Sequence, residues 1–261
     1  MLVVPAVDSH THLNHPRLYH RLPEVLDRAR RAGVSQMIVV GYDLPSSRSA
    51  VELAMAHPGL WAAVGVHPHE AKSFRRAASE ALRALASNPR VVAIGETGLD
   101  FHRDLSPREQ QREAFTAHAH LARELSLPLI VHCREAQEEM LAVATEEGEG
   151  GWIWHCFEGT AEQARRAVDM GMWIGLAGTV TYRNAQPLRQ AVAEMPVERM
   201  VVETDSPYLS PAPGRMRDNE PANVLLVAEA IAGIRGVEVD DVIRATTENA
   251  KAAFRLEERG A

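Results

Sequence analysis

The sequence predicts a single-domain (β/α)₈ barrel of the TIM type, with one additional C-terminal helix, over residues 1–261. Short apolar runs rich in Val and Ile alternate with amphipathic segments, as expected for parallel strands covered on both faces. Six potential metal ligands stand after such runs, and a closed barrel gathers its strand ends at one mouth. A doubly wound open sheet, the alternative fold, would spread these ends along a line. The six are His10, His12, Glu96, His132, His155 and Asp205.

Eight units of strand and helix follow one another in this pattern. The short, continuously apolar runs favour buried strands at 2–7, 36–40, 61–66, 91–95, 128–131, 152–154, 172–176 and 200–202. The longer amphipathic segments after them favour helices at 23–32, 45–56, 77–86, 107–125, 135–147, 160–170, 187–193 and 222–234. Pro107 suits the first turn of the longest helix, with Ser106 as its cap. A last helix over 239–254 closes the predicted fold.

Composition favours a cytoplasmic globular protein without disulfides. With 261 residues, 46% of them hydrophobic, the chain can bury a sizeable core. Cys133 and Cys156 are predicted to be free thiols of a reducing compartment, and a disulfide or thiolate ligands are the alternatives. No basic leader follows Met1, and no uncharged apolar stretch approaches the length of a membrane span. We therefore expect no membrane partner.

The net charge of −7 argues against a broad electrostatic surface for nucleic acid, since binding to many phosphates normally uses basic patches. A small anionic part of a substrate held by metal ions is still compatible with this charge.

The first two candidate ligands are His10 and His12. Residues two apart in an extended chain project to the same face, so both imidazoles can reach one metal ion. Glu96 follows the apolar run 91–95, where an unpaired carboxylate would be costly. Its two oxygens can bridge two ions, which a histidine cannot do.

The remaining three candidates follow the fifth, sixth and eighth runs. His132 and His155 each supply one ring nitrogen, although either histidine taken singly is better interpreted as a satisfied core residue. Asp205 can bind metal and also accept a proton from a metal-bound water. It is the joint placement of all six residues that predicts a metal centre.

Several segments of the chain resemble the signature segments of the TatD family, metal-dependent hydrolases of the amidohydrolase superfamily. They are VDSHTH at 7–12, GVHPH at 65–69, GETGLD at 95–100, HCR at 132–134, HCF at 155–157 and ETDSPYL at 203–209. The resemblance implies a TIM-type barrel whose divalent metal site hydrolyses phosphodiester bonds in DNA. It also implies the same six metal ligands.

We hypothesise two metal ions that share Glu96 as a bridge. One ion is expected between the His10–His12 pair and Asp205, and the second between His132 and His155. The catalytic roles fall to Asp205, as the base for a metal-polarised water, and to Glu96. Ligand softness favours Zn²⁺ or Mn²⁺ over Mg²⁺, whereas the resemblance implies Mg²⁺, so the identity of the ions stays open.

Three further residues are candidates for substrate binding. His67 can hydrogen-bond a phosphate oxygen, as the resemblance implies, or can be a histidine that supports a metal ligand or lies on the surface. Arg215 and Arg217 can clamp phosphate or can be solvated on an exposed loop. The chain departs from the family pattern nearby, with Met216 in place of glycine and Asp218 at a position that is usually not acidic. Glu158 also replaces a small hydroxyl residue.

Two other functions use the same sequence features. An amidohydrolase that cleaves a small amide, ester or lactone needs similar ligands, but often carries a lysine after the fourth strand, where this chain has Glu96. A partner-binding barrel without activity would be expected to lack some ligands, and none of the six is missing. The sequence therefore favours the phosphodiesterase, with DNA as the expected substrate.

Overall fold

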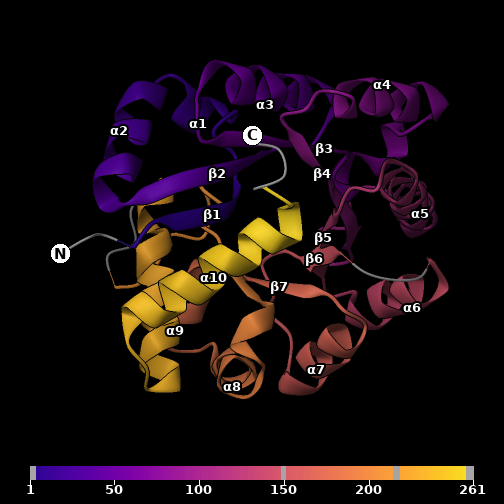
Figure 1. Ribbon diagram of the computed structural model, residues 1–261. Helices are drawn as coiled ribbons and strands as arrows, with labels where there is room; N and C mark the ends of the chain where they lie inside the picture. Colours follow the sequence, from indigo (N-terminus) through magenta and orange to yellow (C-terminus); the bar gives the residue numbers. More distant parts are fainter. Residues whose placement is uncertain (1–3, 148–150, 214–217, 257–261) are drawn as a thin grey trace.

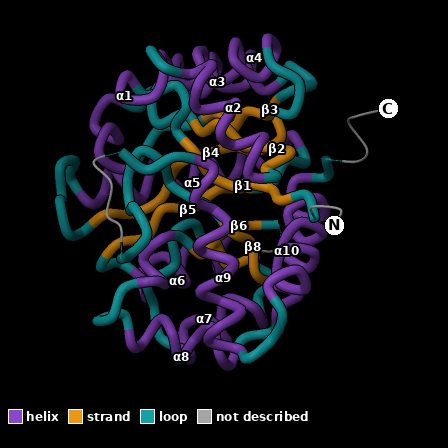
Figure 2. Tube along the Cα trace, turned by 90° about the vertical axis from the view of Figure 1, so that its left-hand side faces the viewer, coloured by secondary structure: helices purple, strands orange, loops and turns teal. Residues whose placement is uncertain are grey.

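The computed structural model describes residues 4–147, 151–213 and 218–256, and its strands form a barrel surrounded by helices (Figure 1). All eight strands belong to one sheet, in the order β1 to β8, and neighbours along that order are parallel. Figure 2 shows the strands enclosed by the layer of helices. This topology confirms the predicted (β/α)₈ barrel.

The strands are β1 Ala6–Thr11, β2 Val34–Val40, β3 Leu60–Val64, β4 Val91–Asp100, β5 Leu129–Arg134, β6 Trp152–Trp154, β7 Trp173–Leu176 and β8 Met200–Val202. The predicted ends of β1, β4 and β5 were wrong, because these strands continue past their apolar runs. His10, Glu96 and His132 consequently lie within strands and not after them. Their polar side chains find polar partners at the mouth, so the ladder continues without an apolar sequence.

The helices are α1 Pro16–Tyr19, α2 Leu22–Ala32, α3 Leu44–Ala56, α4 Arg76–Ala86, α5 Arg108–Leu125, α6 Gln137–Glu147, α7 Ala161–Asp169, α8 Gln186–Glu194, α9 Val224–Arg235 and α10 Val239–Phe254. Short 3₁₀ helices lie at η1 Pro68–Ser73, η2 Gly178–Thr181, η3 Val197–Arg199 and η4 Pro221–Asn223. The predicted helices correspond to α2–α10. The prediction lacks α1 and the 3₁₀ turns, which are too short to show a helical period.

Local hydrogen bonds fix where several helices begin. Asp43 caps α3 and Thr160 caps α7, each in a reciprocal capping box. The predicted cap of α5 was wrong: Pro107 occupies the cap position. The Ser106 hydroxyl instead donates to the carbonyl of His69, which ties the start of α5 to the loop after β3.

The barrel closes between β8 and β1 at the carboxyl ends of the strands. The Asp205 N–H donates to the His10 carbonyl at 2.9 Å, and the His12 N–H donates to the Ser206 carbonyl at 2.7 Å. The buried Asp8 carboxylate accepts hydrogen bonds from the Thr204 N–H and hydroxyl, at 2.9 and 2.6 Å. These closing contacts hold His10, His12 and Asp205 next to one another.

The opposite end of the barrel is covered by α10. Interior residues of the strands, including Val7, Ile130 and Val201, share one apolar cluster with Phe254 of α10. The Thr247 hydroxyl donates to the carbonyl of Pro5, just before β1. The polar mouth and the apolar floor therefore lie at opposite ends. Over the described ranges, no helix combines the length and the hydrophobicity needed to span a bilayer.

Candidate metal centre

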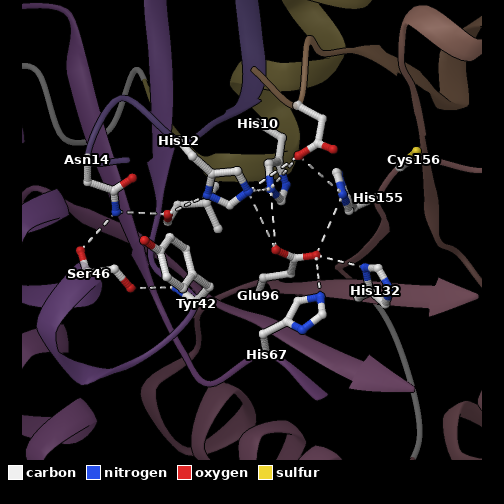
Figure 3. Close-up of polar contacts among 12 residues, drawn as sticks. His10, His12, Asn14, Tyr42, Ser46, His67, Glu96, His132, His155 and Cys156 are labelled. Atoms are coloured by element: carbon white, nitrogen blue, oxygen red, sulfur yellow. Dashed lines mark hydrogen bonds and ion pairs between the residues drawn. The ribbon is translucent and has the colours of Figure 1, made fainter. Parts of the chain in front are cut away.

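The carboxyl ends of the strands bring all six predicted ligands together, five of which are labelled in Figure 3. His10 comes from β1, Glu96 from β4 and His132 from β5. His12, His155 and Asp205 lie in the loops directly after β1, β6 and β8.

Glu96 occupies the centre of this cluster, with its two carboxylate oxygens facing different histidines. Oε2 lies 3.6 Å from His10 Nε2 and 3.8 Å from His12 Nε2. Oε1 lies 2.9 Å from His132 Nδ1 and 3.6 Å from His155 Nε2. This is the arrangement that a carboxylate needs in order to bridge two ions.

Asp205 lies on the side of the cluster formed by β1. Its Oδ1 atom is 3.3 Å from His12 Nε2 and 3.8 Å from His10 Nε2. The same oxygen is 3.9 Å from His155 Nε2.

Burial and the facing charges shift the pKa values of these groups in opposite directions. Burial alone would raise the pKa of Glu96, but the surrounding imidazoles hold it well below its usual range. Burial likewise opposes protonation of His12, but the Asp205 carboxylate raises the pKa of His12 above its ordinary value. The pKa of His10 is lowered by burial and by the neighbouring His155. The Glu96 carboxylate is therefore favoured in its ionised form, in which it can bind a metal ion.

The donor chemistry of the cluster fits divalent metal ions. Ring nitrogens and a carboxylate oxygen lie within 4.8 Å of one another in three groups of described residues, which are His10, His12, Glu96; His10, His155, Glu203; and His67, Glu96, His132. Within the described ranges, the ion pairs of the buried Glu96 all involve histidines and no lysine or arginine. A buried carboxylate faced only by imidazoles suits a bound cation, because nitrogen and carboxylate oxygen are its usual ligands.

Three of the histidines have an oxygen atom close to the ring nitrogen that faces away from the centre. His12 Nδ1 is 2.9 Å from the Val40 carbonyl, and His132 Nε2 is 3.3 Å from Asp100 Oδ2. His155 Nδ1 is 2.8 Å from Glu203 Oε1. Sequence reasoning gave Glu203 no role, although it follows the apolar run 200–202 just as Glu96 follows 91–95.

His67, predicted to contact substrate, lies beside the cluster. Its Nε2 atom is 3.6 Å from Glu96 Oε1, and its Nδ1 accepts the N–H of His69. Burial lowers the pKa of His67 well below its ordinary value, which favours the neutral ring. His69 Nε2 lies 2.8 Å from Asp100 Oδ2, so Asp100 joins the loop after β3 to His132.

Arg215, Arg217 and Met216 lie outside the described residues. Asp218, which follows them, contacts two arginines: the Arg17 Nε donates to Oδ1 at 2.6 Å, and Arg21 Nη2 lies 3.3 Å from Oδ2. Glu158 is exposed. Cys133 and Cys156 form no disulfide with each other.

Comparison with known proteins identifies the family of this chain. The model of the family described as TatD related DNase matches residues 7–255. The chain belongs to the TatD family. It is 39% identical over 251 residues to the uncharacterized metal-dependent hydrolase YabD of Bacillus subtilis, covering 95% of this chain and 98% of that protein. It is also 39% identical over 245 residues to the 3'-5' ssDNA/RNA exonuclease TatD of Klebsiella pneumoniae, covering 91% of this chain and 93% of that protein.

The similarity to the TatD family is also seen in a comparison with a solved structure. The structure of YjjV, a TatD homologue from Escherichia coli, superposes with a TM-score of 0.91 at 29% identity, covering 96% of this chain and 98% of that chain. The similarity therefore includes the whole barrel and both of its ends.

Proposed function

We propose that this TatD-family protein is a divalent-metal-dependent hydrolase that cleaves phosphodiester bonds of DNA with an activated water. The observation that carries the proposal is the position of Glu96, whose two oxygens face two separate sets of imidazoles. The exonuclease activity in the name of the Klebsiella pneumoniae relative favours single-stranded nucleic acid as the substrate.

The proposed ligands of one ion are His10, His12 and Asp205, and those of the other are His132 and His155, with Glu96 shared. Bound divalent ions polarise water and offset negative charge on phosphate oxygens. Mg²⁺, Mn²⁺ and Zn²⁺ are all candidates, because the donor set admits each of them.

Asp205 is the proposed base. Burial would raise its pKa, but the hydrogen bond to His12 and the nearby His155 lower it, so the carboxylate stays ionised and able to accept a proton. The position of Oδ1, within 3.9 Å of three ring nitrogens, keeps this acceptor at the cluster. No protein nucleophile is invoked.

His67 is the proposed contact to a non-bridging phosphate oxygen. Its ring is directed at the cluster by the His69 N–H bond to Nδ1, which leaves Nε2 facing inward as a donor. Arg215 and Arg217 are proposed to bind the substrate backbone, since guanidinium groups match phosphate with paired donors.

The proposal can be tested with metal-stripped protein incubated with end-labelled single-stranded DNA, a small phosphodiester, a lactone and an amide. Mg²⁺, Mn²⁺ or Zn²⁺ is added one at a time, and products are separated by gel or chromatography. We expect metal-dependent cleavage of DNA. Turnover of the lactone or amide without cleavage of either phosphodiester would replace the proposal with the amidohydrolase alternative.

A further inference from the structure

Glu203 is a buried carboxylate for which the proposed mechanism has no use. It follows β8 directly, and its side chain is fully buried. Its polar contacts among the described residues are with His155, the backbone N–H of Cys156 and, at 3.5 Å, the Ser9 hydroxyl. Because burying a charge is costly without a partner, the contact with His155 calls for an explanation beyond packing.

The imidazole of His155 lies between Glu203 and the metal centre. Its Nδ1 atom is 2.8 Å from Glu203 Oε1, whereas its Nε2 is 3.6 Å from Glu96 Oε1 and 3.9 Å from Asp205 Oδ1. A carboxylate this close to Nδ1 favours the tautomer with its hydrogen on Nδ1, and this tautomer leaves Nε2 as the free donor to a metal.

The same carboxylate oxygen also fixes the backbone next to His155. Glu203 Oε1 accepts the N–H of Cys156 at 2.6 Å, and Cys156 adopts a positive φ of 47°. The His155 ring stacks on His10, with ring centroids 3.6 Å apart and planes 21° apart. A shift of Glu203 would therefore be transmitted to ligands of both proposed ions.

Gly175 of β7 supplies an independent observation. A Cβ atom at this position would lie 2.7 Å from Glu203 Oε2 and 3.0 Å from its carboxyl carbon. The glycine leaves the space that this carboxylate occupies, so any larger side chain there must displace Glu203.

We propose that Glu203 is a positioning residue that acts through His155, holding the ring so that Nε2 faces Glu96 and a bound cation. The inference rests on the proposed metal site and does not depend on which substrate is cleaved.

A double-mutant cycle separates this role from a merely structural one. Mn²⁺ and Zn²⁺ affinities of metal-stripped wild type, Glu203→Gln, His155→Ala and the double variant are measured by competition with a chelating indicator. We expect Glu203→Gln to weaken binding of one ion by about 10- to 100-fold, the usual effect of losing such a partner. In the His155→Ala background the same substitution should have no further effect, because the ring through which it acts is absent.

Two results would overturn the positioning role. One is unchanged metal affinity in Glu203→Gln, and the other is an equal loss of affinity in the presence and absence of the His155 ring. A wild-type protein that binds no divalent ion would instead contradict the proposed metal site itself.

A second variant leaves Glu203 unchanged and alters the space around its carboxylate, in case Glu203→Gln does not fold. Gly175→Ala should weaken the same ion, because the added methyl group displaces the carboxylate. Gly233→Ala in α9 is the matched control, since a Cβ there meets no atom within 4 Å. Wild-type metal affinity in folded Gly175→Ala would also contradict the proposal.

The tautomer of His155 can be observed directly. In the zinc-loaded wild type, ¹⁵N NMR should show the hydrogen of His155 on Nδ1, and a hydrogen on Nε2 would contradict the proposal.

Discussion

Asp205 is the residue whose charge the proposed chemistry uses most directly. Asp205→Asn keeps the shape of the side chain but removes its ability to accept a proton. We expect the rate constant for hydrolysis of single-stranded DNA to fall by about 10²- to 10⁴-fold, the usual contribution of a general base. Steady-state kinetics at saturating metal tests this. Asp169→Asn, an exposed position on α7, should retain the wild-type rate; an equal loss in both variants would exclude a specific role for Asp205.

The buried side chain of His118, which is not one of the proposed metal ligands, is expected to make the stability of the protein depend on pH. This buried histidine of α5 accepts the Val66 N–H at Nε2 and contacts the Ala114 carbonyl through Nδ1. Burial lowers the pKa of His118 from 6.5 to about 4. The folded state therefore disfavours the proton, so stability is fully present above pH 6.5 and is lost as the pH falls towards 4.

The expected loss from His118 is about 3 kcal/mol, since one pKa unit corresponds to about 1.4 kcal/mol. Urea unfolding in chelator at neutral pH and near pH 4.5 measures it. His118→Gln does not titrate, so its free energy of unfolding should fall less over this interval. If both proteins lose the same free energy of unfolding over this interval, the pH dependence does not come from His118.

At the scale of elements, the β4–β5 pair depends on Gly98. This residue has a φ of +133°, and a Cβ there would lie 2.0 Å from the His132 carbonyl oxygen. Gly98→Ala should lower the free energy of unfolding by about 2 kcal/mol or more, because both strain and a clash with β5 are introduced. It should also weaken metal binding through His132. Gly233→Ala, which meets nothing within 4 Å, should change stability by no more than about 1 kcal/mol. A stability of Gly98→Ala equal to that of wild type would show that β5 can shift to accommodate the added methyl group without destabilising the fold.

The same strands show what sequence can and cannot predict. Apolar runs located all eight strands and the ligands near their ends, because burial on both faces leaves a pattern in the sequence. The extensions of β1 and β4 were not predictable in this way, since His10 and Glu96 are polar and their partners come from other strands. Glu203 also follows an apolar run, but its pairing with His155, which follows β6 two strands away in the sheet, has no pattern in the sequence.

At the scale of the whole molecule, an apolar cluster that stabilises the barrel and the residues of the proposed metal site lie at opposite ends. Phe254 of α10 packs into the floor, at the end opposite the ligands. Phe254→Ala should cost about 3–5 kcal/mol of stability, as expected for a large buried side chain. Metal affinity measured on the folded fraction should stay at its wild-type value. Val237→Ala, at an exposed position, should change neither quantity. A parallel loss of stability and metal affinity in Phe254→Ala would show that the two ends are coupled.

The whole molecule also explains why distant residues could be grouped before their contacts were known. A barrel of parallel strands brings the same end of every strand to one mouth, so placement after a strand is enough to predict proximity. It does not predict which side chains pair there. The contacts of Asp218 with Arg17 and Arg21 depend on how the loop after β8 meets α1 and α2, and no sequence pattern indicated them.

Glu96 is proposed to join two metal-binding groups into one hydrolytic site. The most direct measurement is the rate of Mn²⁺-dependent hydrolysis of end-labelled single-stranded DNA by Glu96→Ala, with circular dichroism to confirm the folded barrel. We expect a folded protein without metal-dependent hydrolysis. Full activity in the folded Glu96→Ala protein would contradict it.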